Sequence, residues 1–323
     1  MAERAAARRA WTEVSVAVSA RAAEAAAAIL HDLRAGGLIE ERPAPSVVRL
    51  RCYLPPSPLV PATLRSLRRR IRGLARYGLD PGPARISGRA VAPRRWATAW
   101  RAHVRPVRVG RILVRPSWSA PPRRVGRTVV VRIDPGMAFG TGMHPSTRLC
   151  LRALQRYALA ARRGTRSRPG LRREPGHAPA VVDVGTGSGI LAIAAAKLGA
   201  GRVWAVDTDP VAVAVARGNA RLNGVAARVR VVRGTGLAGA PGRADLILAN
   251  LVAETIVPLI PEARDHLAPG GVFVGSGIVA GGLAGVLRAA RAAGLRRLGV
   301  LREGAWRAVA LRATSASTRR PRR

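Results

Sequence analysis

The chain has few aromatic residues, almost no lysine and only two cysteines. Aromatic residues make up 3% of its 323 residues, and Lys197 is its only lysine, so nearly all of its positive charge is arginine. Cys52 and Cys150 fit neither the spacing of a zinc site nor a framework of disulfides. No uncharged apolar run approaches the ~18–20 residues of a membrane span, and no signal peptide is apparent. We therefore expect a cytoplasmic protein with no metal and no membrane contact.

Apolar and basic residues are what the chain has in excess. The apolar share is 48%, which is ample for packed cores and too high for a chain disordered throughout. The length suggests roughly two domains of ~150 residues. The formal net charge is +39. A genome biased towards arginine codons would produce this composition, and the scarcity of lysine favours that explanation; a surface selected to contact RNA stays open as the alternative.

The first part of the chain has the pattern of one small α/β unit. Alternating apolar residues predict four strands, at 11–19, 38–41, 47–53 and 84–91. Two helices are predicted at 19–33 and 59–77. The second helix carries many arginines on its polar face, which is more often a solvated face than an RNA contact. The order β-α-β-β-α-β is that of a ferredoxin-like domain.

From Val129 onward strands and helices alternate, which is the signature of a parallel sheet flanked by helices. Strands are predicted at 181–184, 202–207, 228–232, 245–250 and 272–275, and a closing hairpin at 297–302 and 306–312. Helices are predicted at 190–198, 210–222, 254–267 and 283–293. A basic loop rich in glycine and proline is expected at 160–179. The predicted organisation is a domain at 1–92, a linker at 93–122, a domain at 123–313 and a disordered basic tail at 314–323.

The most informative stretch is VVDVGTGSGILAIAAAKLGA, an apolar strand that runs into a glycine turn and then a helix. Gly185, Gly187 and Gly189 let the backbone turn tightly and approach a ligand at the carboxyl edge of the sheet, where open α/β folds bind ligands. A dinucleotide-binding loop would place its third glycine one position later, at Ile190. The spacing is closer to the loop of S-adenosylmethionine-dependent methyltransferases.

Two polar residues end the strands that follow. Asp207 closes RVWAVD, and its carboxylate can accept hydrogen bonds from both ribose hydroxyls of a nucleoside cofactor. Asp209 stands before Pro210 and is predicted to cap a helix, a duty that is not apparent for Asp207. Asn250 closes ADLILAN, where an uncharged amide can accept an N–H from an amine nucleophile; a cap or turn is its structural alternative.

A second glycine-rich turn precedes a helix predicted from about Ser146 to Leu154. Within DPGMAFGTGMHPSTRLCLRAL, backbone amides and Thr147 at the helix start would form a polar lip over a bound carboxylate or nucleoside. His144 could be a base, and a histidine packed for structure is an equal alternative. No Ser/His/Asp set and no cluster of metal ligands supports a hydrolase or a metalloenzyme.

Together these motifs resemble the ribosomal protein L-eleven (L11) methyltransferase family. The resemblance covers about residues 11–312 and is strongest from 94 to 280. It is carried by DPGMAFGTGMHPSTRLCL, the glycine loop, VDTDPVAVAVARGNARLNGV, ADLILANLVAETI and the connector RRWATAWRAHVRPVRVGRILVRPSW. It implies a small ferredoxin-like domain that recognises the ribosomal protein, followed by a seven-stranded, Rossmann-like class I methyltransferase domain.

Motif position in this family implies that S-adenosylmethionine contacts Thr147, Gly185, Gly187, Asp207 and Asn250. The resemblance also implies methylation of the N-terminal α-amine and lysine ε-amines of L11, free or on the large subunit. We expect a monomer in which Asn250 orients the amine, with ribosomal RNA as an additional partner if the basic surface is used.

Three other functions stay open as alternatives. They are a methyltransferase acting on RNA or on another protein, a ribosome-binding factor without catalysis, and a nicotinamide oxidoreductase, which the loop spacing disfavours. The tetrapeptide Asn250–Leu251–Val252–Ala253 lacks the Asn-Pro-Pro-aromatic signature of adenine methylation. The chain departs from the family at Met143, where threonine is common, and at Arg94–Arg95, where acidic residues often stand.

Overall fold

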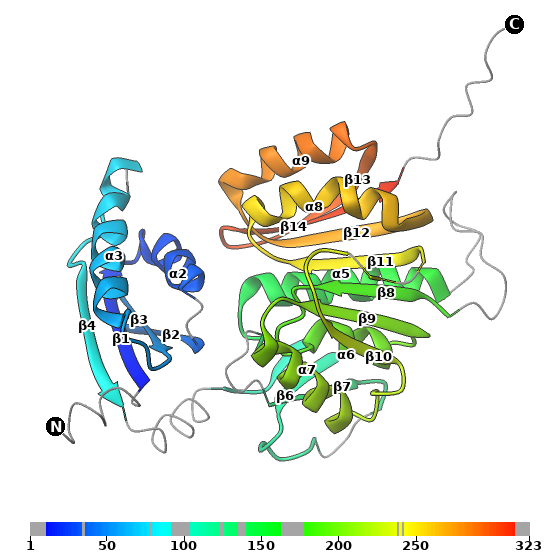
Figure 1. The fold of residues 1–323 in the computed structure, drawn as a ribbon, viewed down its shortest axis with the longest axis horizontal. Helices are drawn as coiled ribbons and strands as arrows, with labels where there is room; N and C mark the ends of the chain where they lie inside the picture. Colours follow the sequence, from blue (N-terminus) through cyan, green and yellow to red (C-terminus); the bar gives the residue numbers. More distant parts are fainter. Residues whose placement is uncertain are drawn as a thin grey trace, which may run out of the picture. The chain divides into compact units, whose positions relative to one another are not determined.

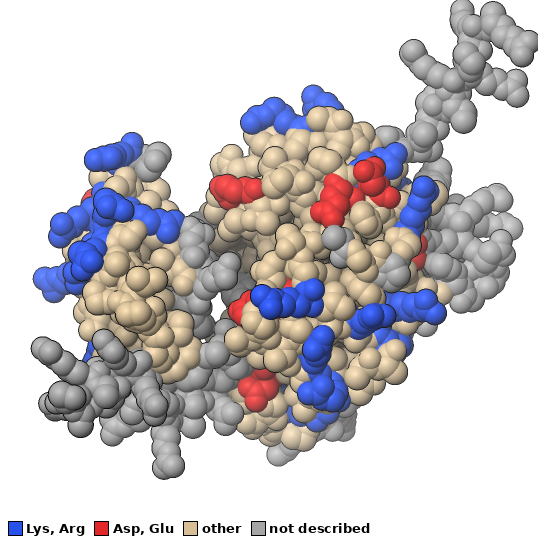
Figure 2. Space-filling model, viewed as in Figure 1, with Lys and Arg blue, Asp and Glu red and all other residues tan. Residues whose placement is uncertain are grey.

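The computed structural model divides the chain into two compact units, residues 1–104 and 105–323 (Figure 1). The structure describes residues 11–33, 36–77, 79–91, 104–122, 126–134, 140–162, 178–237, 239–240 and 242–313. Basic side chains are scattered over the visible face of the second unit, with acidic ones between them (Figure 2).

The first unit is a four-stranded antiparallel sheet with two helices on one face. Its strand order is β2-β3-β1-β4, with β1 at Trp11–Ser19, β2 at Gly36–Ala44, β3 at Val47–Leu54 and β4 at Arg85–Val91. The helices are α2 at Ala23–Asp32 and α3 at Val60–Gly73, which continues into the 3-10 turn η1 at Leu74–Tyr77. The order of elements along the chain is the predicted one.

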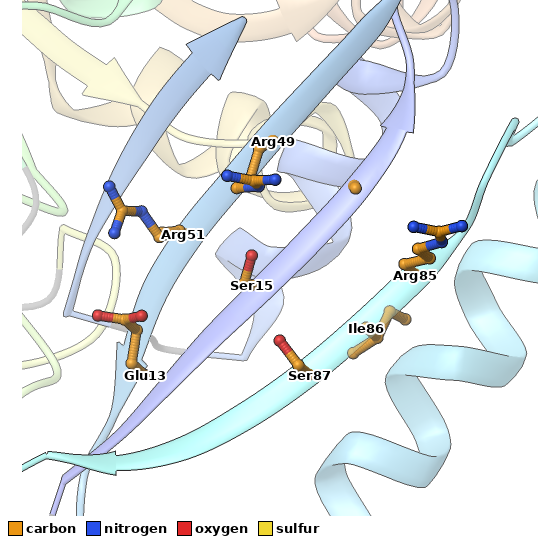
Figure 3. Close-up of a pocket in the computed structure, with 8 residues that line it drawn as sticks. Glu13, Ser15, Arg49, Arg51, Arg85, Ile86 and Ser87 are labelled. Atoms are coloured by element: carbon orange, nitrogen blue, oxygen red, sulfur yellow. The ribbon is translucent and has the colours of Figure 1, made fainter. Parts of the chain in front are cut away.

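Alternation along the strands gives this sheet an inner and an outer face. Val14, Val16 and Val18 of β1 are fully buried and belong to one apolar core with Leu67 and Ile71 of α3. The alternating side chains of β1 between these valines lie on the outer face (Figure 3). A period of two in the sequence is therefore what divides the sheet into a packed side and an open side.

The first predicted helix begins later than expected. Ser19 lies ahead of a turn at residues 20–22, and its hydroxyl accepts a hydrogen bond from the Ala22 amide (3.2 Å). The helix itself starts at Ala23 and ends at Asp32, and strand β2 begins at Gly36.

The second unit is built on a seven-stranded sheet with the order β10-β9-β8-β11-β12-β14-β13. Its strands are β8 at Ala180–Val184, β9 at Arg202–Asp207, β10 at Val229–Arg233, β11 at Ala244–Asn250, β12 at Leu267–Val279, β13 at Leu295–Glu303 and β14 at Trp306–Ala313. Neighbours from β10 to β12 are parallel, whereas β14 is antiparallel to β12 and β13.

Helices cover both faces of this sheet. They are α5 at Pro145–Arg162, α6 at Ile190–Lys197, α7 at Pro210–Leu222, α8 at Ala253–His266 and α9 at Leu283–Ala292, with a 3-10 turn η3 at Ala280–Gly282. Val181 of β8 packs in the core that contains residues of α5, α6 and α7, and the next residue, Val182, packs in the core formed with α8 and α9.

The predicted linker is partly folded, which corrects the expected start of the second domain. Within it, β5 at Val107–Val109 and β6 at Ile112–Pro116 form a small sheet with β7 at Val129–Ile133. Ile112 and Val114 are buried in the same core as α5 and α6, so this sheet is part of the second unit, which begins at residue 105. The predicted tail at 314–323, residues 94 and 95, and most of the predicted loop at 160–179 lie outside the described residues.

Among the described residues, no helix has the length and apolar character needed to cross a membrane. Within the same part of the chain, no group of three or more His, Cys, Asp or Glu is placed to hold a metal ion. Cys52 and Cys150 are both free and buried, and burial raises the pKa of Cys52 to about 12.

Candidate functional site

Three parallel strands of the large sheet end at the predicted site residues. β8 lies between β9 and β11, so the carboxyl ends of the three strands meet at one edge. Gly185 follows β8, Asp207 ends β9 and Asn250 ends β11. The strands after β8 lie on both of its sides, and such a switch point is where open α/β sheets bind ligands. The structure thus brings these residues to one edge, as a ligand site requires.

The glycine loop needs glycine for both its conformation and its packing. Gly185, Gly187 and Gly189 have φ values of 70°, 54° and 82°, in the left-handed region that favours glycine. A Cβ on Gly185 would lie 2.6 Å from Cδ2 of Leu251, and a Cβ on Gly189 would lie 3.2 Å from Cα of Ala216. The loop therefore lies close against both the residue after β11 and helix α7.

Asp207 has a local structural duty that the sequence did not reveal. Its Oδ2 accepts a hydrogen bond from the Gly187 amide (2.9 Å), and its Oδ1 accepts one from the Asp209 amide (3.0 Å). Each carboxylate oxygen keeps a further lone pair, so the ribose role stays a prediction. Asp209 caps α7 by accepting from the Val211 amide (2.8 Å), with Pro210 at the first helical position, and this confirms its predicted role.

Thr147 and Asn250, far apart in the sequence, are in direct contact. Asn250 donates from Nδ2 to the hydroxyl of Thr147 (3.2 Å), and Thr147 is fully buried. The other amide atom, Oδ1 of Asn250, is buried and accepts no hydrogen bond within the described part of the chain. A buried acceptor without a donor costs ~1–3 kcal/mol. This oxygen therefore marks a position where a donor from a bound molecule would be stabilising.

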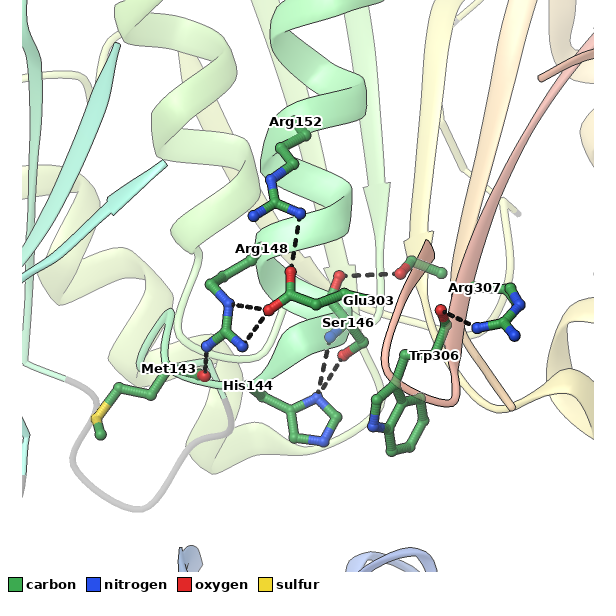
Figure 4. A network of polar contacts seen from close by, with 9 residues as sticks. Met143, His144, Ser146, Arg148, Arg152, Glu303, Trp306 and Arg307 are labelled. Carbon is green, nitrogen blue, oxygen red and sulfur yellow. Dashed lines mark hydrogen bonds and ion pairs between the residues drawn. The ribbon is translucent and has the colours of Figure 1, made fainter. Parts of the chain in front are cut away.

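A polar network holds the start of α5, where Thr147 lies (Figure 4). His144 has its Nδ1 2.7 Å from the hydroxyl of Ser146, and its ring packs edge-on against Trp306 of β14 with centroids 4.6 Å apart. Ser276 of β12 donates to the carbonyl of Ser146 (2.9 Å). His144 is thus packed at the start of α5, and its alternative role as a base stays a prediction.

An ion pair ties the same helix to the terminal hairpin. Arg148 donates from Nε to Oε1 of Glu303 (2.7 Å), and Arg152 donates to Oε2 of the same carboxylate (2.9 Å). Arg148 also donates to the carbonyl of Met143, so one guanidinium joins the turn before α5 to the end of β13. Sequence reasoning missed Glu303, although it is an isolated acid among arginines and stands in the predicted turn.

Asn219 on α7 joins the upstream motif to the glycine loop. Its Nδ2 donates to the carbonyls of Ser188 (2.9 Å) and Asp134 (3.1 Å), and its Oδ1 accepts from the Asp134 amide (2.9 Å). Ser188 in turn donates to the carbonyl of Gly140 (2.7 Å). Asn219 is 2% exposed, so these bonds are made away from solvent. Sequence reasoning did not single this residue out.

One helical turn further on, Asn223 repeats the arrangement with the backbone of Arg132. It accepts from the Arg132 amide (2.9 Å) and donates to the Arg132 carbonyl (2.6 Å). The two asparagine amides thus pair with the backbone of residues 132–134 as a neighbouring strand would. The glycine at position 136, predicted to belong to the second turn, lies outside the described residues.

Beneath the glycine loop, Asp183 is fully buried. Its Oδ2 accepts from the hydroxyl of Thr186 (2.7 Å) and from the amide of Ala192 (3.1 Å), while Oδ1 has no partner among the described residues. Burial raises the pKa of Asp183 to about 7, although both hydrogen bonds act in the opposite direction. The side chain links β8 to the loop and to α6.

A mixed, mostly parallel sheet flanked by helices, with this glycine loop and these strand ends, defines the class of the protein, an α/β methyltransferase-like fold. A solved ribosomal protein L11 methylase from Lactobacillus delbrueckii subsp. bulgaricus matches it with a TM-score of 0.55 and 32% identity. The match covers 65% of this chain and 100% of that chain.

The sequence comparisons identify the family. The model of the family "Ribosomal protein L11 methyltransferase (PrmA)" matches residues 10–314. A ribosomal protein L11 methyltransferase from Pelotomaculum thermopropionicum is 42% identical, over 94% of this chain and 98% of the relative. One from Levilactobacillus brevis is 38% identical, over 93% and 96%. The chain belongs to this family, whose methyl donor is S-adenosylmethionine.

Proposed function

We propose that the chain methylates amino groups of ribosomal protein L11, namely its N-terminal α-amine and lysine ε-amines. Membership of the family supports methyl transfer to this substrate. The observation that carries the amine assignment is the buried Oδ1 of Asn250, an uncharged acceptor without a donor among the described residues. Such an atom suits the N–H of a neutral amine, because holding the hydrogen leaves the lone pair of the nitrogen free to react.

The residues present fit the cofactor. Gly185 and Gly187 permit close approach of a ligand to the backbone, and Asp207 offers its remaining lone pairs to ribose hydroxyls. Thr147 and Asn250 complete the polar edge. When bound, S-adenosylmethionine supplies an electrophilic methyl group on a positively charged sulfur.

In the proposed reaction the protein acts by positioning and desolvating the amine. A lysine amine has a pKa of ~10.4 and must lose its proton before it can attack. An apolar surrounding lowers the pKa of an amine, and Asn250 would then hold the neutral form in line with the reacting carbon. No dedicated base is needed in this scheme, because desolvation favours the neutral form of the amine before it attacks.

We further propose that the first unit is a ferredoxin-like domain that recognises the ribosomal protein, and that the second is a Rossmann-like class I methyltransferase domain. The element order of the first unit and the seven-stranded sheet of the second support these assignments. The enzyme would act as a monomer in the cytoplasm, on L11 free or on the large subunit.

Replacing Asn250 by alanine tests the amine assignment. With purified L11 and labelled cofactor, turnover should fall about 100-fold, because a misplaced amine loses the benefit of orientation. Cofactor affinity, measured by calorimetry, should change much less. Val252→Ala alters an exposed neighbour (37% exposed) and serves as the matched control, with both values unchanged.

Peptide mapping of the labelled product identifies the methylated groups. Label on the α-amine and on lysines would support the proposal, whereas label in RNA when separated ribosomal components are supplied would refute it. Unchanged turnover in Asn250→Ala would remove that residue from the amine-orienting role.

A further inference from the structure

The outer face of the sheet in the first unit contains a shallow groove walled by arginines (Figure 3). The helices α2 and α3 pack on the opposite face, in the core around Val14, Val16 and Val18. The groove has a volume of about 430 Å³. Its floor consists of the small residues Ser15, Ala17 and Ser87, and its walls include Arg49, Arg51 and Arg85.

The strand register explains why a groove forms here. Ala17 on the central strand β1 pairs with Arg49 of β3 on one side and with Arg85 of β4 on the other. Ser15 pairs in the same way with Arg51 and with a serine, Ser87. The long side chains of Arg49 and Arg85 thus flank the short side chain of Ala17. The Cα atoms of the two arginines are separated by two strand spacings, or about 10 Å.

Arg49 and Arg85 supply the unneutralised charge of this groove. Arg51 is paired with Glu41, and Arg89 lies 3.5 Å from the carboxylate of Glu13 at the groove's end. Both Arg49 and Arg85 are exposed, and no described residue forms an ion pair or hydrogen bond with either guanidinium. The groove therefore presents two free guanidinium groups above a floor that carries hydroxyls.

We propose that this groove binds the phosphate backbone of RNA. A guanidinium matches a phosphate with two parallel hydrogen bonds, and serine hydroxyls are common partners of phosphate and sugar oxygens. No aromatic side chain lines the groove, so bases find no stacking platform and the contact is independent of sequence. The excess of positive charge over the whole chain strengthens the attraction.

An acidic peptide is the competing occupant, and the floor of the groove disfavours it. Extended peptides bind sheets mainly through main-chain hydrogen bonds at a free edge. β1, which runs along the middle of the groove, is paired with β3 on one side and with β4 on the other, so a peptide lying over it gains no such bonds; the free edge belongs to β4, at the side of the groove. A phosphodiester needs only side-chain donors, which Arg49, Arg85 and the two serines provide. The RNA contact adds to the proposed function, because a ribosomal protein meets this enzyme either free or bound to RNA.

The test measures RNA binding by the full chain without cofactor or ribosomal protein, so it succeeds or fails independently of methyl transfer. The probe is a fluorescein-labelled oligouridylate of about 12 nucleotides, followed by anisotropy over a range of salt concentrations. The double variant Arg49→Gln/Arg85→Gln is compared with Arg65→Gln/Arg72→Gln, which removes the same charge from exposed positions of α3, the helix that packs on the other face of this sheet.

Removal of two phosphate contacts should make the slope of log K against log salt shallower by about 1.4, and binding roughly tenfold weaker at low salt. The α3 variant should keep nearly the slope of the unaltered chain, and circular dichroism should show that both variants are folded. Equal losses in the two variants would overturn the proposal, since only net charge would then matter. Displacement of the RNA by polyglutamate as readily as by unlabelled RNA would overturn it as well.

Discussion

Replacing Asp183 by asparagine tests how the glycine loop is supported. The carboxylate is 0% exposed, and its Oδ2 accepts hydrogen bonds from Thr186 and Ala192. Asparagine has the same shape, and its carbonyl oxygen can accept both bonds. The variant therefore removes a buried ionisable group while leaving the packing of the loop in place.

The sign of the pH effect follows from the direction of the pKa change. Burial raises the pKa of Asp183 from 3.8 to about 7, so between these values the folded state binds more protons than the unfolded state. The stability of the unaltered protein therefore falls as the pH rises through this window, and the effect is complete above about pH 7. A difference of about 3 pK units at ~1.4 kcal/mol each corresponds to about 4 kcal/mol.

The asparagine variant has no ionisable group at this position and therefore does not lose stability in this way as the pH rises. Its free energy of unfolding relative to the unaltered protein should increase by about 1.4 kcal/mol per pH unit between about pH 4 and pH 7. A constant cost of ~1–3 kcal/mol for the unpartnered amide nitrogen shifts the curve without changing its slope. Urea unfolding followed by tryptophan fluorescence at several pH values measures the difference. Asp209→Asn, at the α7 cap, controls for the loss of one charge. A difference that does not vary with pH would refute the raised pKa of Asp183.

Two further changes test the contacts around the loop. Asp207→Ala should weaken cofactor binding about tenfold or more in calorimetry, since it removes both the support of the Gly187 amide and the proposed ribose acceptor; an unaltered affinity would exclude the ribose role. Asn219→Asp replaces donors to the carbonyls of Ser188 and Asp134 with a carboxylate. It should lower the free energy of unfolding by about 3 kcal/mol in urea titrations, and a loss below about 1 kcal/mol would show that these bonds do not hold the upstream segment.

The strands and helices of the second unit were predictable where an apolar run is bounded by residues that end a strand or begin a helix. β9 and α7 have the predicted bounds, because an apolar strand ends at Asp207 and Asp209–Pro210 specifies a helix start. β5 and β6 were missed because they are short and lie among arginines and prolines, and because β6 is completed by pairing with β7 further along the chain. Pairing between strands that are distant in the sequence cannot be predicted from the local alternation of apolar and polar residues.

The site was predictable to the level of strand ends and not to the level of contacts. The sequence placed Gly185, Asp207 and Asn250 at the ends of strands and predicted that all three contact one cofactor, and the carboxyl ends of these parallel strands do meet at one edge. The hydrogen bond between Asn250 and Thr147 depends on how α5 packs against β11, which no local pattern specifies. The pairing of Glu303 with α5 could not be predicted either, because five of the seven described α-helices carry arginines that could pair with a carboxylate.

The arginine excess has two different physical uses in the described residues. Arg217 and Arg228 in the second unit donate to the carbonyls of Val231 and Ala196, so there the guanidinium satisfies backbone acceptors inside the fold. In the groove of the first unit, no described backbone carbonyl accepts from Arg49. A second arginine without a described partner, Arg85, lies in register with it on the other side of Ala17. A codon bias would account for arginine rather than lysine at all these positions, and 56 basic residues against 17 acidic ones leave most arginines without an acidic partner. Arg49 and Arg85 are therefore distinguished by their placement on either side of Ala17 and not by the lack of a partner, and the proposed methyl-transfer edge of glycine, aspartate, threonine and asparagine includes no arginine.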